Sequence, residues 1–215
     1  MEASYTVSYG SRTGGFSRRE VRELALSTLV LTLAFSIAFM EGIQEIISAP
    51  GGLIYILPMS FVAVLTGYLL HELAHKWVAQ RYGLWAEFRY WLFGLVLALA
   101  TSLFGLVFAA PGAVYIAGHA TRERMGRVAA AGPMVNIIIG AALLPLTFMT
   151  PLYLSWILRL VAMINIFLGG FNLLPIPPLD GSKVLFWSKA VWAAMIIAVV
   201  GLYILSMQSS VFTWL

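Results

Sequence analysis

Residues 71–75 read HELAH and place two histidines and one glutamate directly after a run, residues 46–70, that carries no charge. On a helix, positions i and i+4 lie on the same face, so His71 and His75 can both point toward one metal ion. Glu72 then lies beside the same ion, where it can accept a proton from a bound water, as in the H-E-x-x-H motif of zinc peptidases. The segment therefore predicts a Zn²⁺ site with an acid–base group next to it.

The same motif has a simpler interpretation, in which it marks a helix end whose side chains only reach the lipid headgroups. Polar groups inside a membrane segment cost about 2.5–3.5 kcal/mol each on insertion scales, so three together indicate a function. The helix is also expected to stop at residues 82–83, a Tyr-Gly pair two turns beyond the motif. We therefore favour the metal site over the helix end.

The composition is that of an integral membrane protein. Of the 215 residues, 61% are hydrophobic and only 10% are charged. The absence of cysteine excludes thiolate ligands, disulfides and thiol catalysis. A net charge of +4 could suggest a nucleic-acid partner, but the basic residues are scattered at the ends of apolar segments. This pattern indicates orientation in a lipid bilayer and no nucleic-acid binding.

We expect an all-α polytopic membrane protein with about five to six transmembrane helices plus a re-entrant or short β-containing membrane segment. Ser17 and Glu20 fit a capping box that starts a helix at Arg18. Residues 1–23 are expected to form a flexible cytoplasmic N-terminal extension that lacks the features of a signal peptide. The expected spans are residues 24–40, 52–82, 128–149, 152–174 and 190–207.

Lysine and arginine residues orient these spans. With the N-terminus in the cytoplasm, the second span descends toward Lys76 and Arg81, and twelve of the thirteen basic residues fall on the cytoplasmic side. The exception is Arg159, whose long side chain can reach the outer headgroups; the alternative is pairing with Glu41 or Glu45 at an outer gate. The histidine pair would then lie about 10 Å above the inner end of its helix, inside the bilayer.

Residues 90–121 form a 32-residue stretch without Lys, Arg, Asp or Glu, interrupted by Pro111-Gly112. If both flanks are cytoplasmic, the stretch must enter the membrane and return, as a re-entrant hairpin or as two short passes. After the break, residues 113–116 are β-branched or aromatic in character and predict a short strand.

A catalytic zinc ion needs three protein ligands and one open position. Asp180 is the only aspartate in the chain, and it follows a proline-rich break at the inner end of the fourth span. The second and fourth spans run in the same direction, so Asp180 and His75 are expected at the same face of the membrane. Glu87 and His119 are the alternative third ligands, although both are expected in cytoplasmic connecting loops.

Three motifs together resemble the site-2 protease family of intramembrane zinc metalloproteases. They are HELAH at residues 71–75, GPMVN at residues 132–136 and NLLPIPPLDG at residues 172–181. The resemblance covers about residues 53–185. It implies an intramembrane metalloprotease domain over residues 24–215, a minimal core without a PDZ-like or other regulatory domain. The implied reaction is hydrolysis of a peptide bond within or near a transmembrane segment of a membrane protein substrate, as in regulated intramembrane proteolysis.

The resemblance also implies roles for individual residues. His71, His75 and Asp180 would be the zinc ligands, and Glu72 would be the general base. The chain departs from the family at Ala74, where the motif commonly has glycine; alanine should still permit close helix packing.

Three asparagines are further candidates under this resemblance. Asn172 would hold the backbone of the substrate. Asn136 is a second candidate for substrate binding, and both Asn136 and Asn165 are candidate polar supports in the core, with plain interhelical hydrogen bonding as the alternative. The predicted strand edge at residues 114–116 could capture an unwound substrate by strand addition.

Two other classes of protein would share parts of this pattern. A membrane zinc transporter would need paired ligand sets and a water path to both faces, whereas the ligands here gather only at the inner face. A catalytically inactive scaffold that binds membrane helices would keep the zinc and cleave no substrate.

Overall fold

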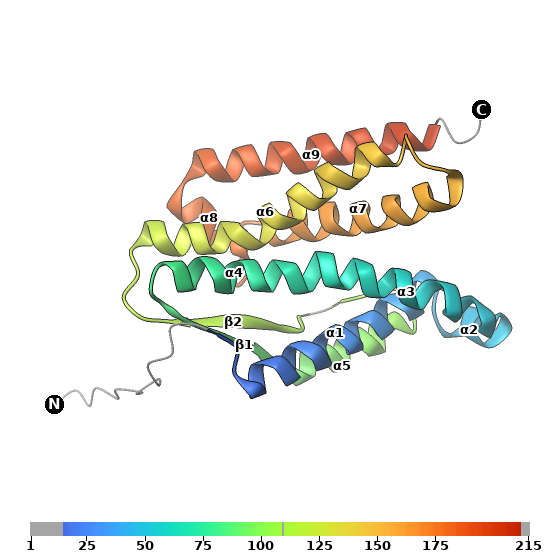
Figure 1. The fold of residues 1–215 in the computed structure, drawn as a ribbon, viewed down its shortest axis with the longest axis horizontal. Coiled ribbons are helices and arrows are strands. Elements are labelled where there is room, and N and C mark those ends of the chain that lie inside the picture. The colour runs from blue at the N-terminus through green and yellow to red at the C-terminus, as the bar shows by residue number, and fades with distance from the viewer. Residues whose placement is uncertain (1–14, 109, 212–215) are drawn as a thin grey trace.

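The computed structural model describes residues 15–108 and 110–211 and shows a bundle of long helices with a small sheet against one part of it (Figure 1). The predicted extension, residues 1–23, lies mostly outside the described residues, and from Arg18 onward it already belongs to the first helix. Five helices of the described chain are long and apolar enough to cross a membrane. The five predicted spans are thereby confirmed: Arg18–Phe39, Pro50–Arg81, Arg122–Leu146, Leu152–Asn172 and Lys189–Met207.

The elements follow one another as helices α1 to α9 with two strands and two short irregular helical turns, η1 and η2, between them. They are α1 (Arg18–Phe39), α2 (Ile43–Ser48), η1 (Pro50–Gly52), α3 (Leu53–Val64), the π-helical turn η2 (Leu65–Leu69), α4 (Leu70–Arg81), β1 (Trp85–Tyr90), α5 (Leu92–Ser102), β2 (Gly112–Ala117), α6 (Arg122–Leu146), α7 (Leu152–Asn172), α8 (Asp180–Trp187) and α9 (Lys189–Val211).

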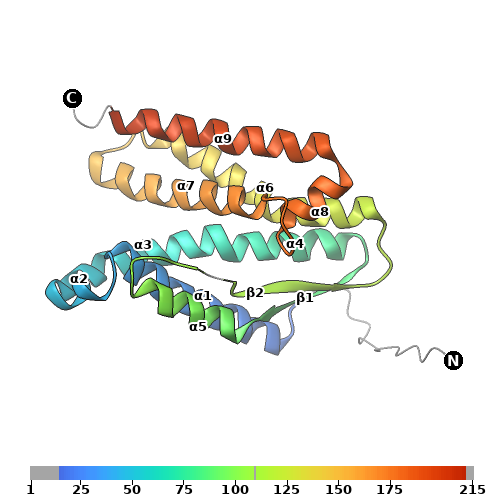
Figure 2. The same cartoon turned by 180° about the vertical axis from the view of Figure 1, so that it is seen from behind.

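The continuous helix α3–η2–α4 lies in the middle of the molecule. Helices α6, α7 and α9 lie on one side of it, and α1, α5 and the two-stranded sheet lie on the other (Figures 1 and 2). The closest neighbours of α4 are α6 on the first side and the sheet on the second. A side chain on α4 can therefore reach both layers.

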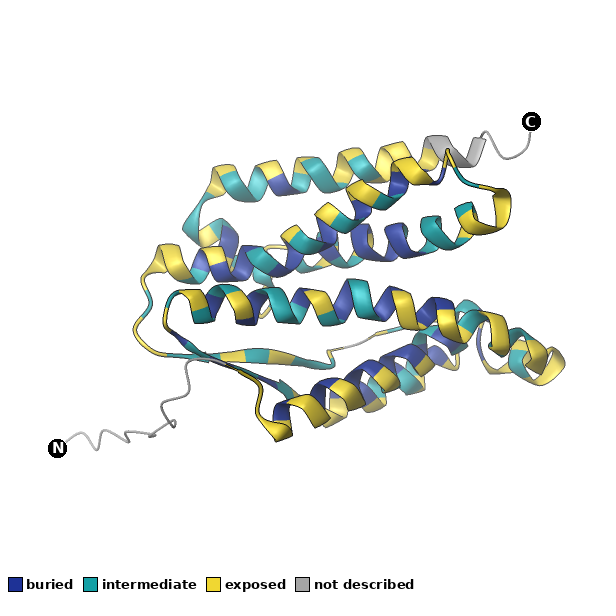
Figure 3. Cartoon of the chain, viewed as in Figure 1, coloured by how far each residue is buried: buried dark blue, intermediate teal, exposed yellow. Residues whose placement is uncertain are grey.

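Buried residues lie on the faces that the helices turn toward one another, and exposed residues cover the outer faces (Figure 3). The exposed residues include large apolar side chains such as Leu29, Ile138 and Ile197, which are 62%, 58% and 70% exposed. Exposed apolar side chains on spans of this length suit contact with lipid tails. The inward faces combine large apolar side chains with small and polar residues, such as Ala34, Ala98 and Ser27, that let helices approach closely.

Helix α1 begins where the sequence predicts, because Ser17 is its N-cap and accepts a hydrogen bond from the Glu20 backbone N–H at 3.0 Å. The Glu20 side chain does not complete the capping box that the sequence predicted. The Glu20 carboxylate points into the protein and binds Lys76 on α4 instead of the helix start.

In the described part of the stretch from residue 90 to residue 121, the chain goes out along one short helix, α5, and returns to strand β2, an arrangement that favours the re-entrant hairpin over the two short passes that the sequence also allowed. Its helix α5 has 11 residues, or about 16 Å at 1.5 Å per residue, which is too short to cross about 30 Å of hydrocarbon. The Trp91 N–H donates to the Pro111 carbonyl at 2.9 Å and ties the two ends of the hairpin together. The predicted short strand is confirmed within β2.

Strand β1 is a correction to the sequence analysis, which placed Glu87 in a connecting loop. Residues 85–90 instead pair antiparallel with β2, from Trp85 opposite Ala117 to Tyr90 opposite Gly112. The alternating burial along β1 is the physical reason, since every second side chain enters the core.

Arg159 lies about two turns into α7 and is half-buried. Its guanidinium donates to the Ser206 carbonyl of α9 at 3.2 Å. The described contact of Arg159 therefore joins two helices of the bundle and does not involve the two glutamates that the sequence offered as partners.

Candidate metal centre

Three side chains from two distant parts of the sequence meet beside α4. The His71 and His75 Nε2 atoms are 3.1 Å apart, and the Asp180 Oδ2 atom lies 3.3 Å from the first and 3.0 Å from the second. The two imidazoles are buried, and the Asp180 side chain is 13% exposed. The structure thus brings together the three residues that the sequence predicts as ligands, and they form a potential metal-binding group of the described chain.

The geometry of this group fits Zn²⁺. A tetrahedral zinc ion with bonds of about 2.0–2.1 Å separates neighbouring ligand atoms by about 3.3 Å. The three observed separations are 3.0–3.3 Å. Two imidazole nitrogens and one carboxylate oxygen are a donor set of catalytic zinc sites, which keep a fourth position open.

The other ring nitrogen of each histidine is engaged by helix α6. The His71 Nδ1 lies 3.2 Å from the Asn136 Oδ1, and the His75 Nδ1 lies 2.7 Å from the Val128 carbonyl oxygen. Both acceptors require the proton on Nδ1, so each Nε2 presents a lone pair to the centre. Helix α6 therefore fixes the tautomer and the orientation of both rings.

Asn136 is itself held on both sides. It is fully buried, and its Nδ2 donates to the Gly67 carbonyl at 3.0 Å. Gly67 belongs to the π-helical turn η2, which interrupts the regular hydrogen-bond ladder just before the two histidines. Because both ends of the Asn136 amide are bonded inside the protein, its geometry favours the polar support over the substrate contact that the sequence also allowed.

Gly132 lies against the ligand atoms on the same face of α6, one turn before Asn136. A Cβ at this position would be 2.4 Å from the His75 Nε2 and 2.6 Å from the His71 Nε2. Bare backbone therefore leaves the space around the two nitrogens open. The GPMVN motif thus contributes both the space for an ion and the orientation of one ligand.

Asp180 is the first residue of α8, which follows the proline-rich loop after α7. A Cβ on the next residue, Gly181, would be 2.0 Å from the Leu173 carbonyl oxygen, so glycine is needed for α8 to start against the end of α7. The Asp180 Oδ2 faces both Nε2 atoms, at 3.3 Å from that of His71 and 3.0 Å from that of His75. A carboxylate oxygen is therefore held where it can act as the third ligand.

Glu72 lies between the candidate metal centre and the sheet. Its carboxylate is close enough to interact electrostatically with His71, His75 and Asp180, and the Val114 backbone N–H of β2 faces it. A carboxylate in this place can accept a proton from a water at the centre.

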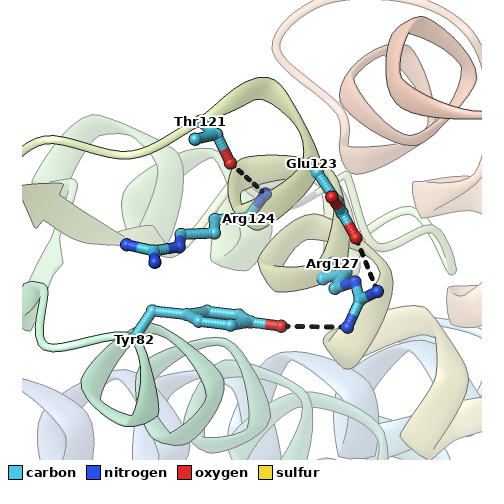
Figure 4. A pocket seen from close by; sticks show the side chains of 5 residues that line it. All are labelled: Tyr82, Thr121, Glu123, Arg124 and Arg127. Atoms are coloured by element: carbon cyan, nitrogen blue, oxygen red, sulfur yellow. Dashed lines mark hydrogen bonds and ion pairs between the residues drawn. The ribbon is translucent and has the colours of Figure 1, made fainter.

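A polar pocket lies between the end of α4 and the start of α6 (Figure 4). Arg127 donates to Glu123 at 2.6 Å and to the Tyr82 hydroxyl at 3.5 Å. Arg127 precedes Val128, whose carbonyl binds a ligand histidine. The contacts of Arg127 therefore join the end of α4 to the first turns of α6, the helix that carries this carbonyl.

The two alternative ligands lie elsewhere. Glu87, on β1, is hydrogen-bonded by Ser17 and forms an ion pair with Arg89 at 2.9 Å. Burial raises the pKa of Glu87, but these two partners outweigh it and hold the pKa below its ordinary value. His119 is exposed in the loop after β2. Neither belongs to the candidate metal group of the described residues.

Asn172 is near the C-terminal end of α7, and its Nδ2 donates to the Leu168 carbonyl of its own helix at 3.0 Å. Asn165 donates to Thr66 at 2.9 Å, which joins α7 to η2. Asn165 therefore makes an interhelical hydrogen bond, whereas the proposed substrate contact of Asn172 stays a prediction.

Several contributors to the site could not be named from the sequence because they act through backbone atoms. These are the carbonyls of Val128 and Gly67 and the N–H of Val114. Gly132 could have been predicted from the sequence, because it stands four residues before Asn136 and so lies on the same face of the helix.

The chain is similar in sequence to proteins that are named zinc metalloproteases. A sequence model described as Peptidase family M50 matches residues 152–207. "Putative zinc metalloprotease MJ0611" of Methanocaldococcus jannaschii is 42% identical over 197 residues, which are 90% of this chain and 96% of that protein. "Zinc metalloprotease MJ0392" of the same organism is 31% identical over 58% of this chain and 32% of its own length. "Putative zinc metalloprotease Rip3" of Mycobacterium tuberculosis is 36% identical over 57% of this chain and 28% of its own length. No solved structure matches the chain.

Proposed function

Because the chain belongs to peptidase family M50, the site-2 family of zinc metalloproteases, we propose that it hydrolyses a peptide bond within or near a transmembrane segment of a membrane protein. The observation that supports this most directly is the meeting of His71, His75 and Asp180 inside a bundle of five potential membrane spans. The partners are then a membrane-embedded substrate helix and the surrounding lipid bilayer.

In this proposal His71, His75 and Asp180 hold the zinc ion. The bound ion supplies a Lewis acid that acidifies water and polarises a carbonyl. Glu72 accepts the proton of the attacking water and delivers it to the leaving amine. Asn136 keeps the His71 ring in the tautomer that presents Nε2.

The outer edge of β2 is the proposed binding surface for the substrate. The N–H groups of Phe88 and Tyr90 on β1 donate to glutamates of α1, away from β2. Because the Phe88 N–H points away from β2, Phe88 and Val114 form a non-hydrogen-bonded pair of the antiparallel sheet. The Val114 N–H therefore points away from β1 as well, toward Glu72. An unwound substrate that adds to this edge would run past the catalytic carboxylate. Asn172 is proposed to bind a further backbone group of the same substrate.

The proposed orientation places the N-terminus and the site end of the helices toward the cytoplasm. Arg81 at the end of α4 and the arginines at the start of α6 support it, because basic residues gather at cytoplasmic ends.

The test is cleavage of a single-span model substrate in detergent, measured together with zinc content. Glu72→Gln should retain zinc while kcat falls by about 10²–10⁴-fold, because only the proton acceptor is lost. Asp180→Asn should lose both zinc and activity. Full activity of Glu72→Gln would end the general-base assignment. Zinc binding by the native chain without cleavage of any single-span substrate would favour the inactive scaffold.

A further inference from the structure

A buried ion pair joins the helix of the histidines to the N-terminal helix. The Lys76 Nζ lies 2.5 Å from the Glu20 Oε2, and the two side chains are 5% and 0% exposed. Lys76 directly follows His75 in the sequence. A buried ion pair is often no more stabilising than apolar residues of the same volume, so stability alone does not account for it.

The pair belongs to a ring of contacts that runs through α1, β1, β2 and α4 and includes Glu72. We call this ring the frame. Glu20 also accepts a hydrogen bond from the Phe88 N–H of β1 at 2.9 Å. Phe88 pairs with Val114 of β2, whose N–H faces the Glu72 carboxylate. Glu72 stands one helical turn before Lys76 on α4, which closes the frame.

Lys76 and Glu20 hold the same edge of β1 through groups of opposite polarity. The Lys76 Nζ donates to the Ala86 carbonyl at 3.2 Å, while the Glu20 carboxylate accepts from the Phe88 N–H two residues further on. Ala86 and Phe88 are both buried. A sheet of two strands is marginally stable by itself, so its position depends on such anchors.

We propose that Glu20 and Lys76 are positioning residues for hydrolysis, which fix the sheet against α4 and so set the position of the β2 edge relative to Glu72. This inference rests on the proposed function, in which the β2 edge binds the substrate. The contacts on which it depends are those of the frame, and they exist in the chain without substrate.

The test uses the double variant Glu20→Gln/Lys76→Met, which removes both charges together and leaves no unpaired buried ion. A glutamine at position 20 can still accept a hydrogen bond from the Phe88 N–H, so the contact of α1 with β1 is kept. The double variant removes the contacts of Lys76 on α4 with Glu20 and with the Ala86 carbonyl. The matched control is Glu23→Gln. Glu23 binds the Tyr90 N–H of β1 at 3.1 Å from the same helix, but its ion pair is with Arg19 and not with α4.

Three experiments are done on each variant: cleavage kinetics with a single-span substrate, which give kcat and KM, zinc analysis, and the hydrogen-exchange rate of the Val114 amide. For the double variant we expect kcat to fall about 100-fold, because a displacement of about 1 Å costs that much. Zinc content should stay at the native level, and the Val114 amide should exchange at least about tenfold faster, since protection follows local opening. Glu23→Gln should change kcat by less than about threefold.

A double variant with kcat and Val114 exchange like those of the native chain would overturn the proposal. If the double variant does not fold, Glu20→Asp decides, because it keeps both charges and draws the carboxylate back by one methylene; we expect a loss in kcat of about tenfold. Native kcat in that variant would equally overturn the proposal. If the native chain cleaves no substrate, the proposed function fails, while Val114 exchange still tests the frame.

Discussion

Gly132→Ala places a methyl group directly against the candidate metal ligands. The new Cβ would be 2.4 Å from the His75 Nε2, whereas ordinary contacts begin at 3.4 Å, so the ring must move by about 1 Å. The ring cannot move freely, because its Nδ1 is bonded to the Val128 carbonyl at 2.7 Å. Zinc sites tolerate about 0.2 Å of change in ligand distance. We therefore expect zinc affinity to fall at least about 100-fold, the upper end of what the loss of a supporting contact costs.

The assay is competition for zinc between the purified protein and a chelator of known affinity, followed by metal analysis. Gly140→Ala is the matched control, because it adds the same methyl group to the same helix two turns away. Its Cβ would be 2.6 Å from the Ile166 Cγ1, a comparable overlap with an apolar side chain. It should therefore lower the unfolding temperature without lowering zinc affinity. If Gly132→Ala binds zinc as tightly as Gly140→Ala does, the assigned place of the metal is wrong.

Three further predictions use the same zinc assay or thermal unfolding. Asn136→Ala removes the acceptor of the His71 Nδ1–H and should weaken zinc binding about 10–100-fold, while native affinity in this variant would show that the contact does not orient the ligand. His119→Ala should keep native zinc affinity because His119 lies in the loop after β2, and a loss of zinc would make it a ligand. Removal of zinc by a chelator should lower the unfolding temperature of the native chain reversibly, since a ligand at 1,000 times its Kd stabilises the folded state by about 4 kcal/mol, and His75→Ala should show no such shift.

The ligands could be predicted from the sequence because their chemistry is in their own side chains. The HELAH spacing places His71 and His75 on one helix face whatever the rest of the chain does. The prediction of Asp180 needed one further inference. The second and fourth spans run in the same direction, so they end at the same face of the membrane. The five spans followed from their length and hydrophobicity alone.

The features that the sequence did not predict depend on partners far away in the chain. Glu20 looked like part of a local capping box, but its carboxylate binds Lys76 and Phe88, which are 56 and 68 residues away. Strand β1 carries Glu87 and Arg89, which made it look like a loop, and its register is set only by pairing with β2. Such tertiary contacts leave no periodic pattern in a single sequence.

X-ray absorption at the zinc edge, on the purified chain in detergent, tests most directly whether His71, His75 and Asp180 bind one ion. We expect two imidazole ligands and additional oxygen ligands at about 2.0–2.2 Å in the native chain, and one imidazole ligand or no bound zinc in His75→Ala. A native spectrum without two imidazoles, or a spectrum that does not change in His75→Ala, would contradict the account.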